Sequence, residues 1–113
     1  MLSPEEKRRV AYHEAGHAIA GWHLEHADPL LKISIVPRGA AALGYNQFLP
    51  RDLSLHTSAQ ICDMMAMAMG GRCAEDMFYD EPSTGASDDL DRITKMAYSQ
   101  VAVYGMNSKV RCC

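Results

Sequence analysis

Two histidines four residues apart, His13 and His17, flank Glu14 in the run His-Glu-Ala-Gly-His. On a helix this spacing places both imidazoles on one face, about one turn of roughly 5.4 Å apart, so both can reach one metal ion. Glu14 falls on the neighbouring flank, where its carboxylate can take a proton from water that the metal binds. The run therefore predicts metal-assisted hydrolysis of the zinc-peptidase type, with His13 and His17 as ligands and Glu14 as general base.

The helix that must carry this run is predicted to begin after Ser3. Ser3 can act as N-cap, Pro4 suits the first helical position and Glu6 completes a capping box. The next proline is Pro29, which predicts a helix of about 24 residues with the histidines near its middle. Its centre is apolar or small on nearly every side, so burial on several faces is predicted, Trp22 included. The alternative is a pair of ordinary core histidines bonded to backbone carbonyls.

A small sheet is predicted after this helix. Residues 30–37 alternate apolar and polar side chains and are rich in β-branched types, and residues 43–50 form a shorter second segment of the same kind. The outer edge of such a sheet can accept an extended substrate as an added strand, which makes Gly44, Tyr45 and Asn46 candidate substrate-binding residues. The alternative is a structural hairpin that covers the core.

Two further helices are predicted. One opens at Thr57 and runs to about Tyr79, and Gly70-Gly71 within it allows close packing against a neighbour. The other has Ser87 as N-cap, two acids in its first turn and an end near Gly105. Its residues predicted to face inward are Ile93, Met96, Ala97, Val101 and Tyr104.

A catalytic zinc site needs a third protein ligand besides the two histidines. The candidates are Glu75, Asp76, Asp88, Asp89, Asp91, His23, His26 and His56. Asp89 is favoured over Glu75, because a carboxylate in the first turn of a helix stays ionised and is held by a rigid element. Glu75 is the alternative ligand, or it accepts a hydrogen bond from the outer N–H of a ligand imidazole and so orients it.

Composition limits the function classes. The chain has 113 residues, of which 48% are hydrophobic, so one small domain with one core is expected. A net charge of −3 and a pI near 5.9 argue against nucleic-acid binding. No membrane segment is expected, since no apolar run approaches bilayer length, and without a phosphate-binding Gly-x-x-x-x-Gly-Lys-Ser/Thr loop the chain is not expected to bind ATP. Cys62 and Cys73 lack metal-site spacing and are predicted to be small buried residues.

Long stretches of the chain closely resemble the peptidase domain of the FtsH family of AAA zinc metalloproteases. Residues 21–32 are most similar to the mitochondrial, paraplegin-like m-AAA members. The resemblance spans residues 2 to about 110 and is carried by the segments 10–18, 35–39, 43–45, 70–75 and 83–90. It implies a mainly α (α+β) fold, a helical zinc-metallopeptidase domain with a two- or three-stranded sheet.

The resemblance also implies roles for single residues. The ligands would be His13, His17 and Asp89, with Asp88 at a variable position of the family and Glu75 in support of a ligand. The family's peptidase domain continues past the region of residue 107, and an ATPase module and membrane segments precede it. Residues 1–113 are therefore expected to be one partial, C-terminally truncated peptidase domain.

The implied activity is zinc-dependent endopeptidase cleavage of unfolded or membrane-protein substrates. In the family this domain belongs to an ATP-dependent, membrane-anchored protease that assembles as a homo- or hetero-hexamer. The implied location is the matrix side of the mitochondrial inner membrane. The alternative is a non-catalytic fragment that serves only as an assembly or packing module.

Overall fold

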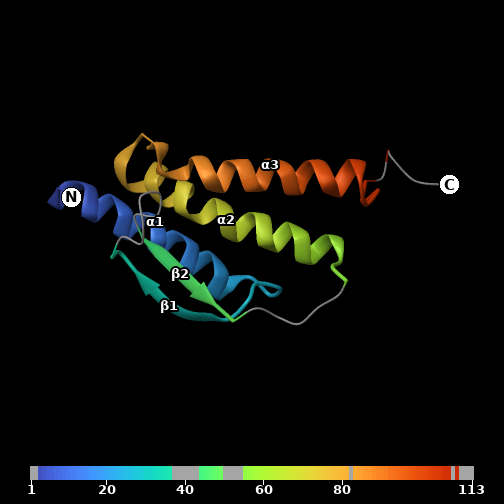
Figure 1. The fold of residues 1–113 in the computed structure, drawn as a ribbon, viewed down its shortest axis with the longest axis horizontal. Helices are drawn as coiled ribbons and strands as arrows, with labels where there is room; N and C mark the ends of the chain where they lie inside the picture. The colour runs from blue at the N-terminus through green and yellow to red at the C-terminus, as the bar shows by residue number, and fades with distance from the viewer. Residues whose placement is uncertain (1–2, 37–43, 50–54, 82, 108, 110–113) are drawn as a thin grey trace.

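Three helices and a two-stranded sheet make up the part of the chain that the computed structural model describes, which is residues 3–36, 44–49, 55–81, 83–107 and 109. The elements are α1 (Pro4–His23), β1 (Leu30–Ser34), β2 (Tyr45–Phe48), α2 (Ser58–Tyr79), the 3-10 turn η1 (Thr84–Ala86) and α3 (Ser87–Ala102). Helix α2 lies in the middle, with α1 on one side and α3 on the other, and the sheet lies beside α1 (Figure 1). The mainly helical class with a small sheet is confirmed.

Both long helices begin with a capping box. The Ser3 hydroxyl accepts a hydrogen bond from the Glu6 N–H at 3.2 Å, and the Glu6 carboxylate accepts one from the Ser3 N–H at 3.3 Å. Thr57 and Gln60 make the same reciprocal pair at the start of α2. These pairs satisfy N–H groups that the first turn of a helix cannot satisfy itself.

Helix α1 is shorter than predicted. It has 20 residues and ends at His23, because Leu24 adopts an extended conformation. The Asp63 carboxylate of α2 accepts a hydrogen bond from the His26 N–H at 2.9 Å, so the chain after α1 is held by α2 and not by a further helical turn. The prediction of about 24 residues was wrong at this end.

Glycines bring α1 and α2 into backbone contact. A Cβ atom on Gly70 would lie 2.5 Å from the carbonyl oxygen of Gly16, and a Cβ on Gly16 would overlap the Gly70 carbonyl. Real side chains do not tolerate such contacts, so only glycine lets the two helix backbones lie this close. The close packing predicted for Gly70-Gly71 is confirmed, and it brings the histidine face of α1 directly against α2.

The strands pair antiparallel and are shorter than predicted. Leu30 pairs with Phe48 and Ser34 with Tyr45, with an irregularity between Leu30 and Lys32. The sheet has two strands among the described residues. Residues 37–43, between the strands, lie outside the described part of the chain.

Several burial predictions were wrong. Helix α3 contains no buried residue, and of the five residues predicted to face inward, Ala97, Val101 and Tyr104 are exposed. A hydrophobic pattern identifies the apolar face of a helix, but it does not supply an element to cover that face. Trp22 is 75% exposed, and Cys62 and Cys73 are exposed as well.

The start of α3 also differs from the prediction. Ser87 is already helical, Ala86 occupies the N-cap position, and no side chain caps this end. The serine that caps is Ser83, whose hydroxyl accepts a hydrogen bond from the Gly85 N–H at the start of η1.

Within the described residues, no helix is both long enough and apolar enough to cross a bilayer.

Candidate metal centre

Three side chains from two distant stretches of the chain converge at one point. The Nε2 atoms of His13 and His17 lie 3.1 Å apart, and Oδ2 of Asp89 lies 3.1 Å from each of them. His13 and His17 come from the middle of α1, and Asp89 comes from the first turn of α3. Among the described residues, these three form the group of His, Cys, Asp or Glu side chains that could hold a metal ion.

Hydrogen bonds on the far sides of the rings determine where the imidazole protons lie. Nδ1 of His17 is 2.9 Å from the Met67 carbonyl oxygen, and Nδ1 of His13 is 2.9 Å from a carboxylate oxygen of Glu75. A carbonyl and a carboxylate can only accept, so each Nδ1 carries the proton and donates it. In the neutral rings both Nε2 atoms therefore present lone pairs toward Asp89.

The chemistry of the three donor atoms and the distances between them both fit a metal ion. Two lone pairs and a carboxylate oxygen facing one another repel unless a cation lies among them. Ligands held at 2.0–2.1 Å in a tetrahedron are roughly 3.3–3.4 Å apart, close to the separations found here. Two imidazoles and one carboxylate form a donor set that catalytic zinc uses, with a fourth position left for water or substrate.

The pKa values of the three groups reflect the same attraction for positive charge. Burial is the largest single cause and lowers the pKa of both His13 and His17. Asp89 together with Glu75 outweighs burial at His13, and Asp89 together with the Met67 carbonyl outweighs it at His17, so the pKa of each imidazole is raised. Burial raises the pKa of Asp89, yet the two histidines hold it well below its usual range. Without a metal, a proton is stabilised among these atoms, so protons and metal compete for the same place.

Glu75 lies one helical turn before the end of α2 and contacts the ring of His13. Its side chain is 1% exposed, and one oxygen binds His13 while the other accepts from Ser83 and Arg9. Burial raises its pKa, but hydrogen bonds from Ser83, His13 and Arg9 lower it overall, so the carboxylate is ionised. Glu75 thus lies on the outer side of the His13 ring, away from the point where the three donors meet.

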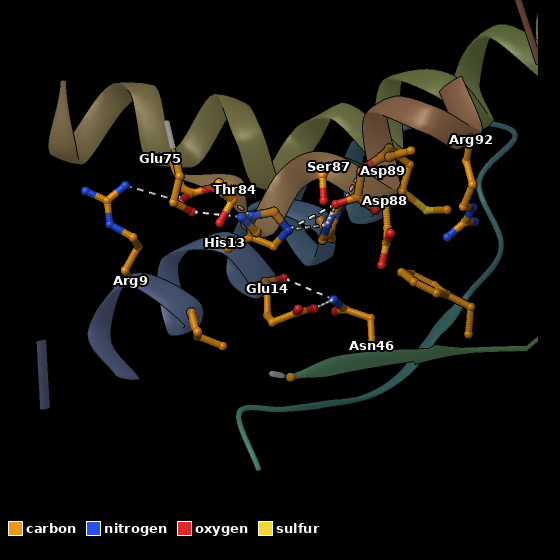
Figure 2. A pocket seen from close by; sticks show the side chains of 18 of the residues that line it. Arg9, His13, Glu14, Asn46, Glu75, Thr84, Ser87, Asp88, Asp89 and Arg92 are labelled. Carbon is orange, nitrogen blue, oxygen red and sulfur yellow. Dashed lines mark hydrogen bonds and ion pairs between the residues drawn. The ribbon is translucent and has the colours of Figure 1, made fainter. Parts of the chain in front are cut away.

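Glu14 faces strand β2. The side-chain amide of Asn46 donates to its carboxylate at 2.5 Å and to its backbone carbonyl at 3.3 Å. Burial raises the pKa of Glu14, while the nearby histidines lower it by a smaller amount, so its affinity for a proton is higher than that of an exposed glutamate. Figure 2 shows Glu14 between His13 and Asn46.

An open cleft of about 1030 Å³ gives access to these groups. Its walls include the three converging side chains, Glu14, and Gly44, Asn46 and Phe48 from the second strand. Strand β2 pairs with β1 alone among the described elements, and Gly44, Asn46 and Phe48 place it along this cleft. The cleft therefore brings together three donor groups that could hold a metal ion, a carboxylate with raised pKa and part of strand β2.

The whole chain, residues 1–113, matches the model of a protein family described as peptidase family M41. The chain belongs to peptidase family M41. The chain is 57% identical over 110 residues to the mitochondrial inner membrane m-AAA protease component AFG3L2 of Mus musculus. It is 57% identical to the mitochondrial ATP-dependent zinc metalloprotease FTSH 3 of Oryza sativa subsp. japonica, and 56% identical to the ATP-dependent zinc metalloprotease FtsH of Rhodothermus marinus.

These alignments cover 97% of the chain but 14%, 14% and 16% of the three relatives. The chain thus spans about one sixth or less of the length of the curated relatives it matches. The resemblance to the FtsH family and to its m-AAA members is confirmed.

Other candidate ligands of this M41 chain lie elsewhere. His26 is close to Glu25 at 3.8 Å, Asp76 pairs with Arg72, and Asp91 pairs with Lys95. His23 and His56 are exposed, the first at the end of α1 and the second before α2. Asp88 is exposed in the wall of the cleft.

Three groups that contact the candidate metal centre were not predicted from the sequence, namely the side chains of Arg9 and Ser83 and the backbone carbonyl of Met67. Arg9 lies one helical turn before His13, so its spacing of four was a usable signal. Ser83 was visible only as a member of the segment 83–90. The Met67 carbonyl is a backbone group 50 residues from the histidine it orients, and no sequence signal marks it. Asn46, expected to bind substrate, uses its amide to hold Glu14.

Proposed function

We propose that residues 1–113 form a partial M41 peptidase domain in which His13, His17 and Asp89 bind zinc and Glu14 acts as general base. The single observation that carries this proposal is the convergence of two imidazole lone pairs and one carboxylate oxygen, each 3.1 Å from the other two. Glu75 takes the supporting role, because it binds the outer nitrogen of the His13 ring.

Zinc, when bound, would supply Lewis acidity that polarises a peptide carbonyl and lowers the pKa of water to about 7. Glu14 then takes the proton of the attacking water and passes it to the departing amine. Its raised pKa suits both transfers, since a stronger base takes the proton more readily and the acid it becomes can still release it. Asn46 holds the Glu14 carboxylate in place during both transfers.

The substrate in this proposal is an extended segment of unfolded or membrane-protein polypeptide. It pairs with the edge of β2 around Gly44, Tyr45 and Asn46, so most of its affinity comes from backbone hydrogen bonds. Gly44 and Asn46 line the cleft beside Glu14, which supports this path. Recognition through backbone atoms makes cleavage tolerant of the substrate's side chains.

The wider setting is proposed from the relatives, whose names include an inner-membrane m-AAA component and ATP-dependent zinc metalloproteases. We infer that the M41 domain works in a homo- or hetero-hexameric protease, where an ATPase module supplies unfolded chain. The inferred location is the mitochondrial inner membrane with this domain on the matrix side.

A peptidase assay tests the proposal. The chain with zinc should cleave an internally quenched, unstructured peptide, and a chelator should stop it. Glu14→Gln should reduce the rate by about 10²–10⁴-fold while zinc stays bound, because a general base is lost and no ligand is. The matched control is Glu5→Gln, which changes an exposed glutamate of the same helix and should leave the rate unchanged.

Two other results of this assay would change the proposal. Undiminished cleavage by the Glu14→Gln chain removes Glu14 from the mechanism. A wild-type chain that binds zinc but cleaves no peptide favours the alternative of a non-catalytic assembly or packing module.

A further inference from the structure

The faces of α1 and α2 that meet at the metal centre carry two matched rows of residues. On α1 the row is Arg9, His13 and His17, and on α2 it is Met67, Gly71, Glu75 and Tyr79. Both rows have the four-residue spacing that keeps side chains on one face of a helix. The helices run antiparallel here, so each residue of one row meets a definite partner in the other.

Contacts pair these rows from end to end. The Met67 carbonyl binds His17, and a Cβ on Gly71 would lie 2.5 Å from His13 Nε2 and 2.7 Å from His17 Nε2. Glu75 binds His13 at 2.9 Å. The last pair is Arg9 with Tyr79, where the guanidinium carbon lies 4.4 Å from the ring centroid.

Arg9 makes three kinds of contact at once. Nη1 donates to Glu75 Oε1 at 3.2 Å and to the Glu81 carbonyl at 2.8 Å, while the guanidinium lies over the Tyr79 ring. Figure 2 shows Arg9 and His13 on opposite sides of the Glu75 carboxylate. Of the groups bound to that carboxylate, Arg9 is the one with a permanent positive charge, since Ser83 is neutral and His13 can be neutral.

The same contacts reach the segment that carries Asp89. Glu81 and Ser83 belong to the connection between α2 and η1, and Arg9 binds the first directly and the second through their shared partner, Glu75. Three residues after Ser83, Ala86 is 1% exposed at the N-cap of α3, so the chain is packed at the point where α3 begins. One arginine of α1 therefore ties together Glu75, which holds a histidine, and the corner that precedes the aspartate.

We propose that Arg9 is a positioning residue for metal binding: it fixes the Glu75 carboxylate, which aligns His13 directly and Asp89 by way of Ser83 before the metal arrives. This inference rests on the proposed zinc function. Arg9 does not touch the metal or the substrate in this role. It acts through Glu75, which keeps the proton of His13 on Nδ1 and leaves Nε2 free to bind.

Zinc affinity measured by competition with a chelating dye at one fixed pH is the first test. Arg9→Met keeps most of the side-chain volume and removes the charge, and it should weaken zinc binding about tenfold, the lower end for loss of a residue that supports a ligand. Arg9→Lys keeps the charge but loses the planar guanidinium that lies over the Tyr79 ring, so its zinc affinity should fall between those of wild type and Arg9→Met. Arg8→Met, an exposed neighbour with the same loss of charge, should change nothing.

A double-mutant comparison separates positioning from a general effect on the fold. Glu75→Gln should weaken zinc binding, and Arg9→Met added to Glu75→Gln should weaken it no further, because Arg9 acts through that carboxylate. Multiplicative losses would overturn the proposal. So would an Arg9→Met chain that binds zinc within twofold of wild type.

Imidazole nitrogen NMR of the metal-free chain supplies a readout that a loss of stability does not imitate. In alkaline solution, at a pH where the spectra show that both rings are neutral, wild-type His13 should carry its proton on Nδ1. Arg9→Met should move part of the His13 population to the Nε2 tautomer, while His17, held by the Met67 carbonyl, should not change. An unchanged His13 overturns the Arg9 proposal alone, whereas a wild-type chain that binds no zinc overturns the proposed function itself.

Discussion

The two sides of the metal centre are built in different ways. His13 and His17 lie in the contact between α1 and α2, where glycines bring the backbones together and both imidazoles are buried. Asp89 comes from α3, a helix with no buried residue. It is located by the corner before it, where Ser83 binds Glu75 and Ala86 is buried. Packing therefore orients the histidines, and a few local contacts place the aspartate.

This difference predicts where the centre is most easily broken. A side chain added within the α1–α2 contact should disturb both histidines at once. Substitutions on the exposed face of α3 should leave the centre intact, because the packing of that helix does not depend on them.

The largest expected effect is that of Gly71→Ala. The added Cβ would lie within 2.7 Å of both His13 and His17 Nε2 atoms, so zinc binding should be lost and the free energy of unfolding should fall by about 3 kcal/mol. Isothermal titration with zinc and denaturant unfolding measure the two effects. Gly21→Ala is the control, since its Cβ would meet the flexible Met67 side chain at 3.1 Å and should cost less. Equal losses in the two chains would contradict the special tightness of the histidine contact.

The second largest effect is expected from a fall in pH, which should weaken zinc binding by protonating His13 and His17. The pKa of each imidazole is raised above the ordinary 6.5, so protons begin to displace zinc at a pH above 6.5. Zinc affinity should be highest above this range and fall as pH falls. The slope should approach roughly a hundredfold per pH unit once both rings are protonated in the metal-free chain. Affinity that stays flat from pH 8 to pH 5, measured by dye competition, would argue against histidine ligation.

The smallest effect is expected on α3. Tyr98 is 72% exposed, so Tyr98→Ser should change the free energy of unfolding by about 0.5 kcal/mol or less and leave zinc affinity unchanged. Denaturant unfolding and zinc titration check both. The buried counterpart is Ile61→Ala on α2, which should cost about 2–4 kcal/mol. A large loss from Tyr98→Ser would show that the exposed face of α3 contributes to folding after all.

The features that were predictable from the sequence depend on neighbours along the chain. The capping boxes at Ser3 and Thr57 use residues three apart, and the His13–His17 pair uses residues four apart, so helical geometry alone brings them together. Gly70-Gly71 indicated close packing because glycine in a helix is otherwise unfavourable.

The features that were not predictable depend on partners far away in the chain. The spacing of Arg9 from His13 indicated that it lies on the histidine face, but its contact with Glu75 spans 66 residues, and the carbonyl that meets His17 is 50 residues away. The exposure of Val101 and Tyr104 had the same origin, since their pattern does not tell whether another element covers them. Ser87 was misassigned as a cap because Ser83 had already capped the turn before it. From the residues alone, Asp89 and Glu75 could not be separated decisively, because both are acids that a fold could bring to the histidines.

The central claim is that Asp89 completes a three-residue metal site with His13 and His17. Zinc titration of wild type, Asp89→Asn and Asp88→Asn tests it most directly, since the two substitutions make the same chemical change at adjacent positions. We expect one zinc per wild-type chain, a loss of more than about a hundredfold for Asp89→Asn, and a change within about threefold for Asp88→Asn. Equal losses at the two positions, or an Asp89→Asn chain that binds zinc as tightly as wild type, would contradict it.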